Sequence, residues 1–380
     1  MSDLARHRGT AAAAALIVLI ALVPLYLEGF WLQTGLFVMA AIVGAIGLTL
    51  LVGRAGQLSL GHAFFVAVGA YGYCYLAGDP AAGAEGDPAG LGLTPFLAAI
   101  GAVALAGGAG ALFSPIAGRV RGIYLGLASL GLVFLGQHIL FNAAGVTGGF
   151  EGRDAAPFAL FGFTFSNTDP DDFAVMGVPF GMLERLWYLE LAVVVLACWF
   201  ARNLVASRPG RALATVRDSE TAAAVMGIDV RRYRALAFVI SSMYAGLAGV
   251  LMALAFGRIV PESFGLLLSI DYLVMIVIGG AGLVAGAVAG AIFVAALPLL
   301  LSHYSDALPL LAEPGSGGLG AAELSRLLYG AAIIAVLLFA PGGIGRLFRR
   351  AVRPDPTALV GPAPVTSTSK PSEAKEESKA

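Results

Sequence analysis

Charged side chains are scarce in this sequence. They make up 12% of the 380 residues, whereas hydrophobic residues make up 58% and the mean hydropathy is +0.86. An average soluble domain is roughly one quarter charged, so this composition predicts an integral membrane protein that lies in a lipid bilayer. The net charge of −1 lacks the basic excess that is typical of nucleic-acid binding, and we expect no nucleic-acid partner.

Lysine and cysteine are almost missing. The three lysines, Lys370, Lys375 and Lys379, lie at the C-terminal end. Because the Walker A motif needs a lysine on the phosphates, the chain cannot itself be a P-loop ATPase. Cys74 and Cys198 fall inside apolar runs, where we expect buried thiols rather than a disulfide or a metal site. The sequence has no clustered nucleophile or metal constellation, which predicts that the chain is not an enzyme and carries no cofactor.

Long apolar runs, by contrast, fill most of the chain. The hydrocarbon core of a bilayer is about 30 Å thick and takes roughly 20 apolar residues per helix. Runs of this kind occupy residues 11–27, 35–52, 58–77, 93–113, 123–141, 187–200, 235–256, 272–301 and 327–340. Runs so long and continuous fit helices rather than barrel strands. We therefore predict an all-α polytopic membrane protein with about eight to ten transmembrane helices.

The arginines sort to one side of the membrane when the crossings are counted from a cytoplasmic N-terminus. Of the 20 arginines, 16 fall on the cytoplasmic side and four fall outside, namely Arg153, Arg185, Arg258 and Arg326. Cytoplasmic loops carry an excess of Lys and Arg, so this split supports the count. Both termini are therefore expected in the cytoplasm.

This count also fixes the domain organisation. The predicted parts are a cytoplasmic N-terminus (1–10), a transmembrane domain (11–345) with a cytoplasmic loop (202–234) and an external acidic loop (143–186), and a cytoplasmic tail (346–380). The run 11–27 is expected to be an uncleaved signal anchor, because no clear small-residue cleavage site follows it. The tail is rich in Pro, Ser, Thr, Lys and Glu, which predicts disorder.

One apolar run is too long for a single crossing. Residues 272–301 would form a helix of about 45 Å. The glycines of "IGGAGLVAGAVAG", residues 278–290, predict a broken or re-entrant segment instead. Irregular backbone at membrane depth is tolerated only where it is buried in protein or lines a cavity, so Gly280 and Gly282 are expected to border a substrate path. A packing face of small residues is the alternative, and the two interpretations are compatible.

A second glycine-rich stretch, "VGRAGQLSLGHAFFVAVGAY", places polar side chains where a helix begins. Gln57, Ser59 and His62 lie near membrane depth, where polar groups usually face a protein interior or a water-filled path. The start of the helix is also expected to offer free N–H groups to a substrate carboxylate. The alternative is that Ser59 caps the helix and His62 bonds a neighbouring carbonyl group.

A few other polar residues interrupt the apolar runs. Gln137, His138 and Asn142 are expected either to line the path or to form hydrogen bonds between helices. Asp271 precedes the long run 272–301, and we expect it to cap that segment.

The stretch "GRALATVRDSETAAAVMGIDVRRYR", residues 210–234, holds five of the 20 arginines between two apolar runs. A helix over residues 211–226 would carry Leu213, Val216, Ala223 and Met226 on a loose apolar stripe, with Arg217 and Glu220 largely off it. Gly227 is a natural stop for that helix. Such a short amphipathic helix is suited to a protein partner in the cytosol; the alternative is a solvated loop whose arginines serve topology alone.

Four segments of the sequence carry a family resemblance. They are "GRAGQLSLGHAFFVAVGAY", "GRALATVRDSETAAAVMGIDVRRYRALAFVISSMYAGLAGVL", "SIDYLVMIVIGGAGLVAGAVAG" and "LLYGAAIIAVLLFAPGGIG". In this order they resemble the permease subunits of branched-chain amino acid ABC importers of the LivM type, over residues 40–345. "ETAAAVMG", residues 220–227, is loosely similar to the EAA loop of ABC importer permeases. The acidic stretch at 154–172 and the tail after residue 354 depart from the family pattern.

The resemblance implies a permease subunit in the inner membrane of a bacterium. Its expected partners are a second permease of similar fold, two cytoplasmic ATP-binding subunits and an external substrate-binding protein. The expected substrates are branched-chain amino acids or related small amino acids and amides. In this view Leu213, Val216, Ala223 and Met226 would bury the contact with the ATPase, Arg217 and Glu220 would set its register, and Gly227 would let the chain turn back.

An ion-coupled secondary transporter of small solutes is the alternative. Such a protein needs no docking helix for an ATPase, and it usually has carboxylates inside the membrane for the coupling ion. Apart from Asp271, the sequence offers only Glu28 and Glu190, which are expected near helix ends. The scarcity of carboxylates therefore favours the ABC permease.

Overall fold

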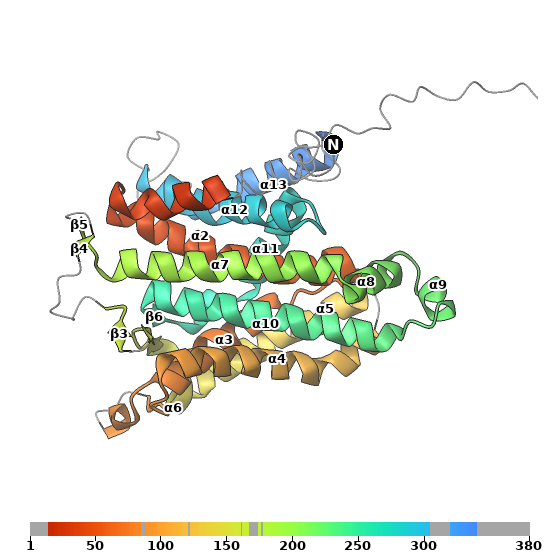
Figure 1. Ribbon diagram of the computed structural model, residues 1–380. Coiled ribbons are helices and arrows are strands. Elements are labelled where there is room, and N and C mark those ends of the chain that lie inside the picture. Colours follow the sequence, from red (N-terminus) through yellow and green to blue (C-terminus); the bar gives the residue numbers. More distant parts are fainter. Residues whose placement is uncertain are drawn as a thin grey trace, which may run out of the picture.

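The computed structural model describes residues 14–84, 88–120, 122–160, 162–166, 174–175, 178–304 and 320–339. The predicted cytoplasmic N-terminus (1–10), the predicted tail (346–380) and parts of the acidic loop lie outside the described residues. Helices dominate the described chain, and the predicted all-α polytopic fold is confirmed (Figure 1).

The helices follow one another with short connections. In chain order they are α2 (Gly29–Leu48), α3 (His62–Ala77), α4 (Pro95–Arg119), α5 (Ile123–Asn142), α6 (Ala144–Thr147), α7 (Met182–Ala206), α8 (Arg208–Asp218), α9 (Glu220–Val225), α10 (Val230–Phe256), α11 (Leu266–Gly279), α12 (Val284–His303) and α13 (Ala321–Phe339). A π-helical turn, Thr49–Arg54, continues α2, and short 3-10 helices cover Val23–Leu25, Pro80–Ala84, Gly149–Glu151 and Pro261–Phe264.

The described residues also include six two-residue strands. They are β1 (Arg153–Asp154), β2 (Ala159–Leu160), β3 (Phe163–Thr164), β4 (Ala174–Val175), β5 (Val178–Pro179) and β6 (Arg258–Ile259). They pair antiparallel as β1 with β6, β2 with β3, and β4 with β5. The β1–β6 pair ties the loop before α7 to the chain that leaves α10.

Six of the described helical spans are long and apolar enough to cross a membrane. They are Gly29–Arg54, Pro95–Arg119, Ile123–Asn142, Met182–Ala206, Val230–Phe256 and Val284–His303. Three apolar helices are shorter, namely Ala14–Leu25, His62–Ala77 and Leu266–Gly279. Counted together, the long and short helices reach the predicted eight to ten segments.

Two helices form the centre of the bundle. In α2 the most apolar window is 78% buried, and in α10 it is 61% buried, whereas the other long spans are 28% to 33% buried. The helix α10 packs against α3 through glycine, since a Cβ on Gly249 would overlap the carbonyl oxygen of Val66. Small residues let transmembrane helices approach this closely, which increases their van der Waals contact.

The long apolar run breaks where its glycines predicted. The helix α11 ends at Gly279 and α12 begins at Val284, with Gly280 at φ 102° and Gly282 at φ 92° in the intervening turn. A Cβ on Gly279 would overlap the carbonyl of Gly286, so the two helices also pack through small residues. The segment is therefore both broken at its glycines and packed through small residues.

The expected role of Asp271 is wrong. The helix α11 begins at Leu266, and Gly265 is its N-cap residue, so Asp271 lies inside the helix and does not cap it. The apolar residues before Asp271 continue the helical pattern toward the N-terminus, and the broken segment is accordingly longer than predicted. With 14 residues, α11 spans about 21 Å, which is less than the hydrocarbon core.

The hairpin and the strands lie at opposite ends of the bundle. The helices α8 and α9 project beyond α7 and α10 at one end, whereas β3, β4, β5 and β6 lie at the other (Figure 1). The helix α10 joins the two ends and has 27 residues, or about 40 Å.

Arginines organise the end that carries the strands. Arg153 is 4% exposed and donates hydrogen bonds to the carbonyl groups of Cys74, Val146 and Ala89. Arg185 donates to the carbonyls of Phe180 and Thr164. Arg258 donates to the carbonyl of Glu151 and to the carboxylate of Asp154. Three of the four arginines that the charge pattern left outside therefore hold loops in place.

Candidate functional site

His62 is buried at the start of α3, in the centre of the bundle. Its side chain is 2% exposed, and its Nε2 atom lies 3.0 Å from the carbonyl oxygen of Gly44 in α2. Because a carbonyl oxygen only accepts, Nε2–H is the donor. The imidazole ring also meets Tyr272 of α11 edge-on, with ring centroids 4.8 Å apart. His62 thus bonds a neighbouring carbonyl, as one of the two alternatives predicted.

The backbone N–H groups around the start of α3 are already bonded. The N–H of Ala63 donates to Ser269 Oγ at 3.0 Å, and the N–H of Leu60 donates to Ser129 Oγ at 2.9 Å. Ser59 Oγ accepts from the N–H of Gly61 at 3.3 Å. Two of the N–H groups that were expected to be free for a substrate carboxylate are thus bonded to side chains of α5 and α11. Sequence reasoning did not identify either serine.

Gln57 is the polar residue here that has unused hydrogen-bonding capacity. It is 3% exposed, and neither its amide oxygen nor its amide nitrogen has a partner among the described residues. A buried polar group without a partner costs about 1–3 kcal/mol, so such a group calls for a functional explanation. Gln57 therefore stays a candidate for contact with substrate or water.

The two predicted path segments meet at this level of the bundle. A Cβ on Gly53 would overlap the backbone nitrogen of Gly282, so the end of α2 touches the turn between α11 and α12 backbone to backbone. At the other end of α11, the N–H of Ala63 donates to Ser269 Oγ and links α3 to α11. The structure therefore brings residues 53–63 against the broken segment.

The polar residues of α5 behave differently from one another. A Cβ on Gly265 would lie 2.9 Å from Gln137 Nε2, so Gln137 reaches the start of α11. Asn142 Nδ2 instead donates to the carbonyl of His138, 2.7 Å away in the same helix. A contact between helices is therefore found for Gln137 alone of these three.

Residues 208–225 form two helices, where a single helix over 211–226 was predicted. The chain is extended at Ser219, with φ −159° and ψ 112°, and its hydroxyl accepts from the N–H of Ala222 at 3.2 Å. Ser219 thus ends α8 and caps α9, because a serine side chain bonds free N–H groups well at a helix start. Ser207 and Asp229 cap α8 and α10 in the same way.

The apolar residues of this hairpin divide into two groups. Leu213 and Val216 are each 2% exposed and Ala223 is fully buried, all within this chain. Met226 is 74% exposed and Val225 is 84% exposed at the end of α9. The three buried residues hold the hairpin against the bundle and cannot form the contact surface expected of them. Val225 and Met226, at the tip, are the large apolar side chains of the hairpin that are exposed to a partner.

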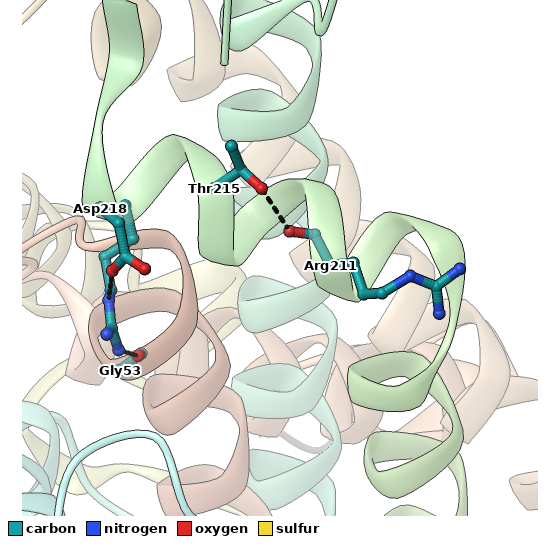
Figure 2. Close-up of polar contacts among 5 residues, drawn as sticks. Gly53, Arg211, Thr215 and Asp218 are labelled. Carbon is teal, nitrogen blue, oxygen red and sulfur yellow. Dashed lines mark hydrogen bonds and ion pairs between the residues drawn. The ribbon is translucent and has the colours of Figure 1, made fainter. Parts of the chain in front are cut away.

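The predicted charges of the hairpin are engaged within the chain. Glu220 of α9 forms an ion pair with Arg234 of α10. Arg217 Nη1 donates to the carbonyl of Gly53 at 2.7 Å, and its Nε donates to the carboxylate of Asp218 at 3.0 Å. Figure 2 shows Gly53 and Asp218 together at one end of α8. Both charged side chains therefore fix the hairpin to the bundle.

Gly227 ends α9 in the predicted manner. Its φ is 77°, the N–H of Ile228 donates to the carbonyl of Ala223 at 2.9 Å, and its own N–H donates to that of Ala224 at 3.0 Å. These are the two bonds of a Schellman motif, in which glycine is the usual left-handed residue. The tip is therefore held in one conformation.

Comparison with known proteins gives a consistent result. The family model described as branched-chain amino acid transport system / permease component matches residues 27–337. The permease protein LivM of Escherichia coli K12, from a high-affinity branched-chain amino acid transport system, is 30% identical over 339 residues, which cover 87% of this chain and 73% of that protein.

More distant permeases match as well, whereas no solved structure does. The permease protein LivH of Salmonella typhimurium is 25% identical over 307 residues, or 79% of this chain and 89% of LivH. The D-allose transport system permease protein AlsC of Escherichia coli K12 is 28% identical over 172 residues, or 45% of this chain and 46% of AlsC. Because the family model spans nearly the whole helical bundle, the chain belongs to the family of branched-chain amino acid transport permease components, and it is a multi-pass protein of the inner membrane.

Proposed function

We propose that this chain is the membrane-spanning permease subunit of an ABC importer. Its substrates are branched-chain amino acids or related small amino acids and amides, and separate subunits hydrolyse the ATP. The names of its relatives LivM and LivH, both permease proteins of branched-chain amino acid transport systems, support this substrate class. Similarity to both supports pairing with a second permease of similar fold. Two ATP-binding subunits and an external substrate-binding protein complete the assembly.

The observation that carries this proposal is the hairpin α8–α9. It lies beyond the membrane helices, its helices are capped, and its tip exposes Val225 and Met226. Exposed apolar side chains on a rigid element are typical of a docking site for another protein. The hairpin thus serves as the coupling element that seats on the ATPase, with the buried Leu213, Val216 and Ala223 supporting it from behind.

The same proposal orients the chain in the membrane. The hairpin and both termini lie in the cytoplasm, and the loop 143–186 lies outside. Support comes from the 16 arginines that the crossing count puts on the hairpin side. The strands β1 and β6 and the hairpin also lie at opposite ends of α10.

The substrate route runs past the junction of α2, α3 and the broken segment. Gln57 would bind substrate there through its unused amide, whereas Ser59 and His62 support the backbone around it. Gly280 and Gly282 provide the turn that borders the route. Discontinuous helices at membrane depth are typical of transporter binding sites, which supports this location.

The docking role is tested by placing a charge on the tip. Val225→Asp and Met226→Asp put a carboxylate in the apolar contact, and copurification of the ATP-binding subunits with the tagged chain should fall while membrane insertion stays normal. Asn203→Asp is the matched control, because it adds the same charge at an exposed position of α7, outside α9. If both tip variants retain the ATP-binding subunits at the wild-type level, the hairpin does not dock and its arginines serve topology alone.

One observation favours the alternative, an ion-coupled transporter. Glu190 was expected near a helix end, but it lies at the ninth position of α7, is fully buried, and has no partner for either carboxylate oxygen among the described residues. A carboxylate inside the membrane is a common site for a coupling ion. The transport assays in the Discussion separate the two functions.

A further inference from the structure

Arg217 is a hairpin residue that reaches the end of the central membrane helix. Its Nη1 atom donates at 2.7 Å to the carbonyl of Gly53, a residue 164 positions away in the sequence. Arg211, in the same helix, donates to the carbonyl of Ala206 at the end of α7 and thus stays within the α7–α8 connection. In Figure 2 the Arg211 side chain points away from Gly53 and Asp218. The two arginines of α8 can therefore be compared, because Arg217 contacts the end of α2 and Arg211 contacts the end of α7.

The acceptor of this hydrogen bond lies at the end of the central helix. Gly53 belongs to the π-helical turn Thr49–Arg54, which continues α2. The last carbonyl groups of a helix have no partner within it, and the negative end of the helix dipole attracts a cation. Arg217 supplies both the donor and the charge, so it fastens α8 to the most buried of the long membrane spans.

The space around Arg217 is kept open by glycine. Gly56 has φ 67°, and a Cβ at this position would lie 2.8 Å from Arg217 Cγ. The "GRAG" sequence, residues 53–56, thus provides the acceptor at its first glycine and the space at its last. This explains why the sequence needs both glycines next to the polar residues 57–62.

Beyond Gly53 the contact continues to the broken segment. A Cβ on Gly53 would overlap the nitrogen of Gly282, and one on Gly282 would lie 3.0 Å from the carbonyl oxygen of Gly53. The same carbonyl group therefore accepts from Arg217 and packs against the turn between α11 and α12. Residues 217, 53 and 282 form one continuous series of contacts from the hairpin to the α11–α12 turn.

We infer that Arg217 is a positioning residue that transmits movement of the hairpin to the α2 end and to the turn at Gly282. This inference rests on the proposed function, because the ATPase is what would move the hairpin. A displacement of α8 pulls the Gly53 carbonyl, and the backbone contact with Gly282 passes the displacement to the α11–α12 turn. The interaction is one hydrogen bond from a charged donor, and the contacts on both sides of it are tightly packed.

The test uses the complete importer reconstituted in proteoliposomes. Arg217→Met keeps the apolar stem and removes the donors, Arg217→Lys keeps the charge, and Arg211→Met is the matched control. Arg217→Met should assemble with the ATP-binding subunits as the wild type does. Its ATP-driven uptake and its substrate-stimulated hydrolysis should fall by about tenfold or more, as expected for loss of a hydrogen bond from a charged group. Arg217→Lys should recover part of this loss, and Arg211→Met should behave as the wild type.

A second variant approaches the same contact from the other side. Gly53→Ala changes no residue of the hairpin, and its Cβ pushes the end of α2 away from Gly282. Uptake should therefore also fall while the ATP-binding subunits stay bound. Wild-type coupling in assembled Arg217→Met overturns the inference. If Arg217→Met fails to assemble, normal coupling in Gly53→Ala overturns it instead. Failure of the wild type to bind an ATPase at all would contradict the proposed function, which distinguishes the two outcomes.

Discussion

Glu190 is a single residue on which the two candidate mechanisms disagree. It is fully buried in α7 and both carboxylate oxygens lack partners among the described residues. Because an isolated ionised carboxylate in an apolar medium is very costly, we expect Glu190 to be neutral. A neutral side chain of this shape contributes packing and needs no coupling ion.

Glu190→Gln should therefore leave ATP-driven uptake at the wild-type level, and it should keep or slightly raise the midpoint of thermal unfolding in detergent. The amide has nearly the same shape and cannot ionise. Uptake and the thermal midpoint of the purified complex are the two measurements. Loss of uptake in a complex of normal thermal stability would favour the ion-coupled alternative.

Gly227 gives a second prediction for a single residue. A non-glycine residue in the left-handed conformation costs on the order of 1 kcal/mol, and a Cβ here would meet nothing within 4 Å. The cost is therefore one of backbone conformation alone. Gly227→Val should weaken binding of the ATP-binding subunits, whereas Gly227→Asn should have a smaller effect because asparagine tolerates this conformation. Equal retention in copurification by Gly227→Val and the wild type would show that the turn does not position the tip.

Residue types in the site were easier to predict than their contacts. The predicted bond of His62 to a neighbouring carbonyl is present, whereas Ser59 does not cap α3, because Gly61 is the N-cap residue and Ser59 accepts from its N–H. Ser129 and Ser269 were missed, because their bonds to Leu60 and Ala63 join residues 69 and 206 positions apart. A contact of that kind depends on helix packing, and a single sequence carries no local signal of it.

At the scale of elements, the hairpin shows that a hydrophobic pattern does not predict which surface covers the apolar residues. Its apolar stripe was visible in the sequence, but Leu213 and Ala223 face the bundle, whereas Met226 faces outward. A hydrophobic pattern marks positions that need cover and does not say whether the same chain or a partner provides it. The break at Ser219 was missed because the pattern continues across it. Glycine was more informative, since both the stop at Gly227 and the break at Gly280 were predicted.

In the proposed route substrate passes the α11–α12 turn, so uptake is expected to depend on the geometry of this turn. Gly282→Leu forces a side chain at φ 92° against the carbonyl of Gly53, and the turn must move. Uptake should fall by about tenfold or more, since the strain and the lost contact each cost 1 kcal/mol or more. Uptake by the reconstituted complex is the measurement.

Gly108→Leu is the control for this variant, because a Cβ at Gly108 of α4 meets nothing within 4 Å and the position is exposed. Its uptake should match that of the wild type. Normal uptake by assembled Gly282→Leu would remove the turn from the substrate route.

For the whole molecule, composition and charge predicted the class of protein well. The scarcity of charge and the length of the apolar runs are global quantities, and they indicated the all-α polytopic fold. The exact helix ends were harder, because the short helix α3 begins just after Gln57 and Ser59, two polar residues that the bundle buries. Hydropathy is calculated from one segment at a time and does not include its burial by other helices.

The proposed topology predicts opposite labelling of two engineered cysteines. In a background without Cys74 and Cys198, Phe150→Cys at the strand end should react with an impermeant thiol reagent in intact cells. Thr221→Cys in the hairpin should react only after the membrane is opened. Both positions are exposed, so the membrane decides the difference in access. Labelling of Thr221→Cys from outside would reverse the orientation of the chain.

The central claim is that ATP hydrolysis by partner subunits drives transport through this chain. Uptake of labelled leucine into proteoliposomes that contain the complete complex and the binding protein, with and without ATP on the hairpin side, tests it most directly. We predict uptake only with ATP, unchanged when a protonophore and a sodium ionophore collapse the ion gradients. Uptake driven by an ion gradient without ATP, and abolished by the ionophores, would contradict the account.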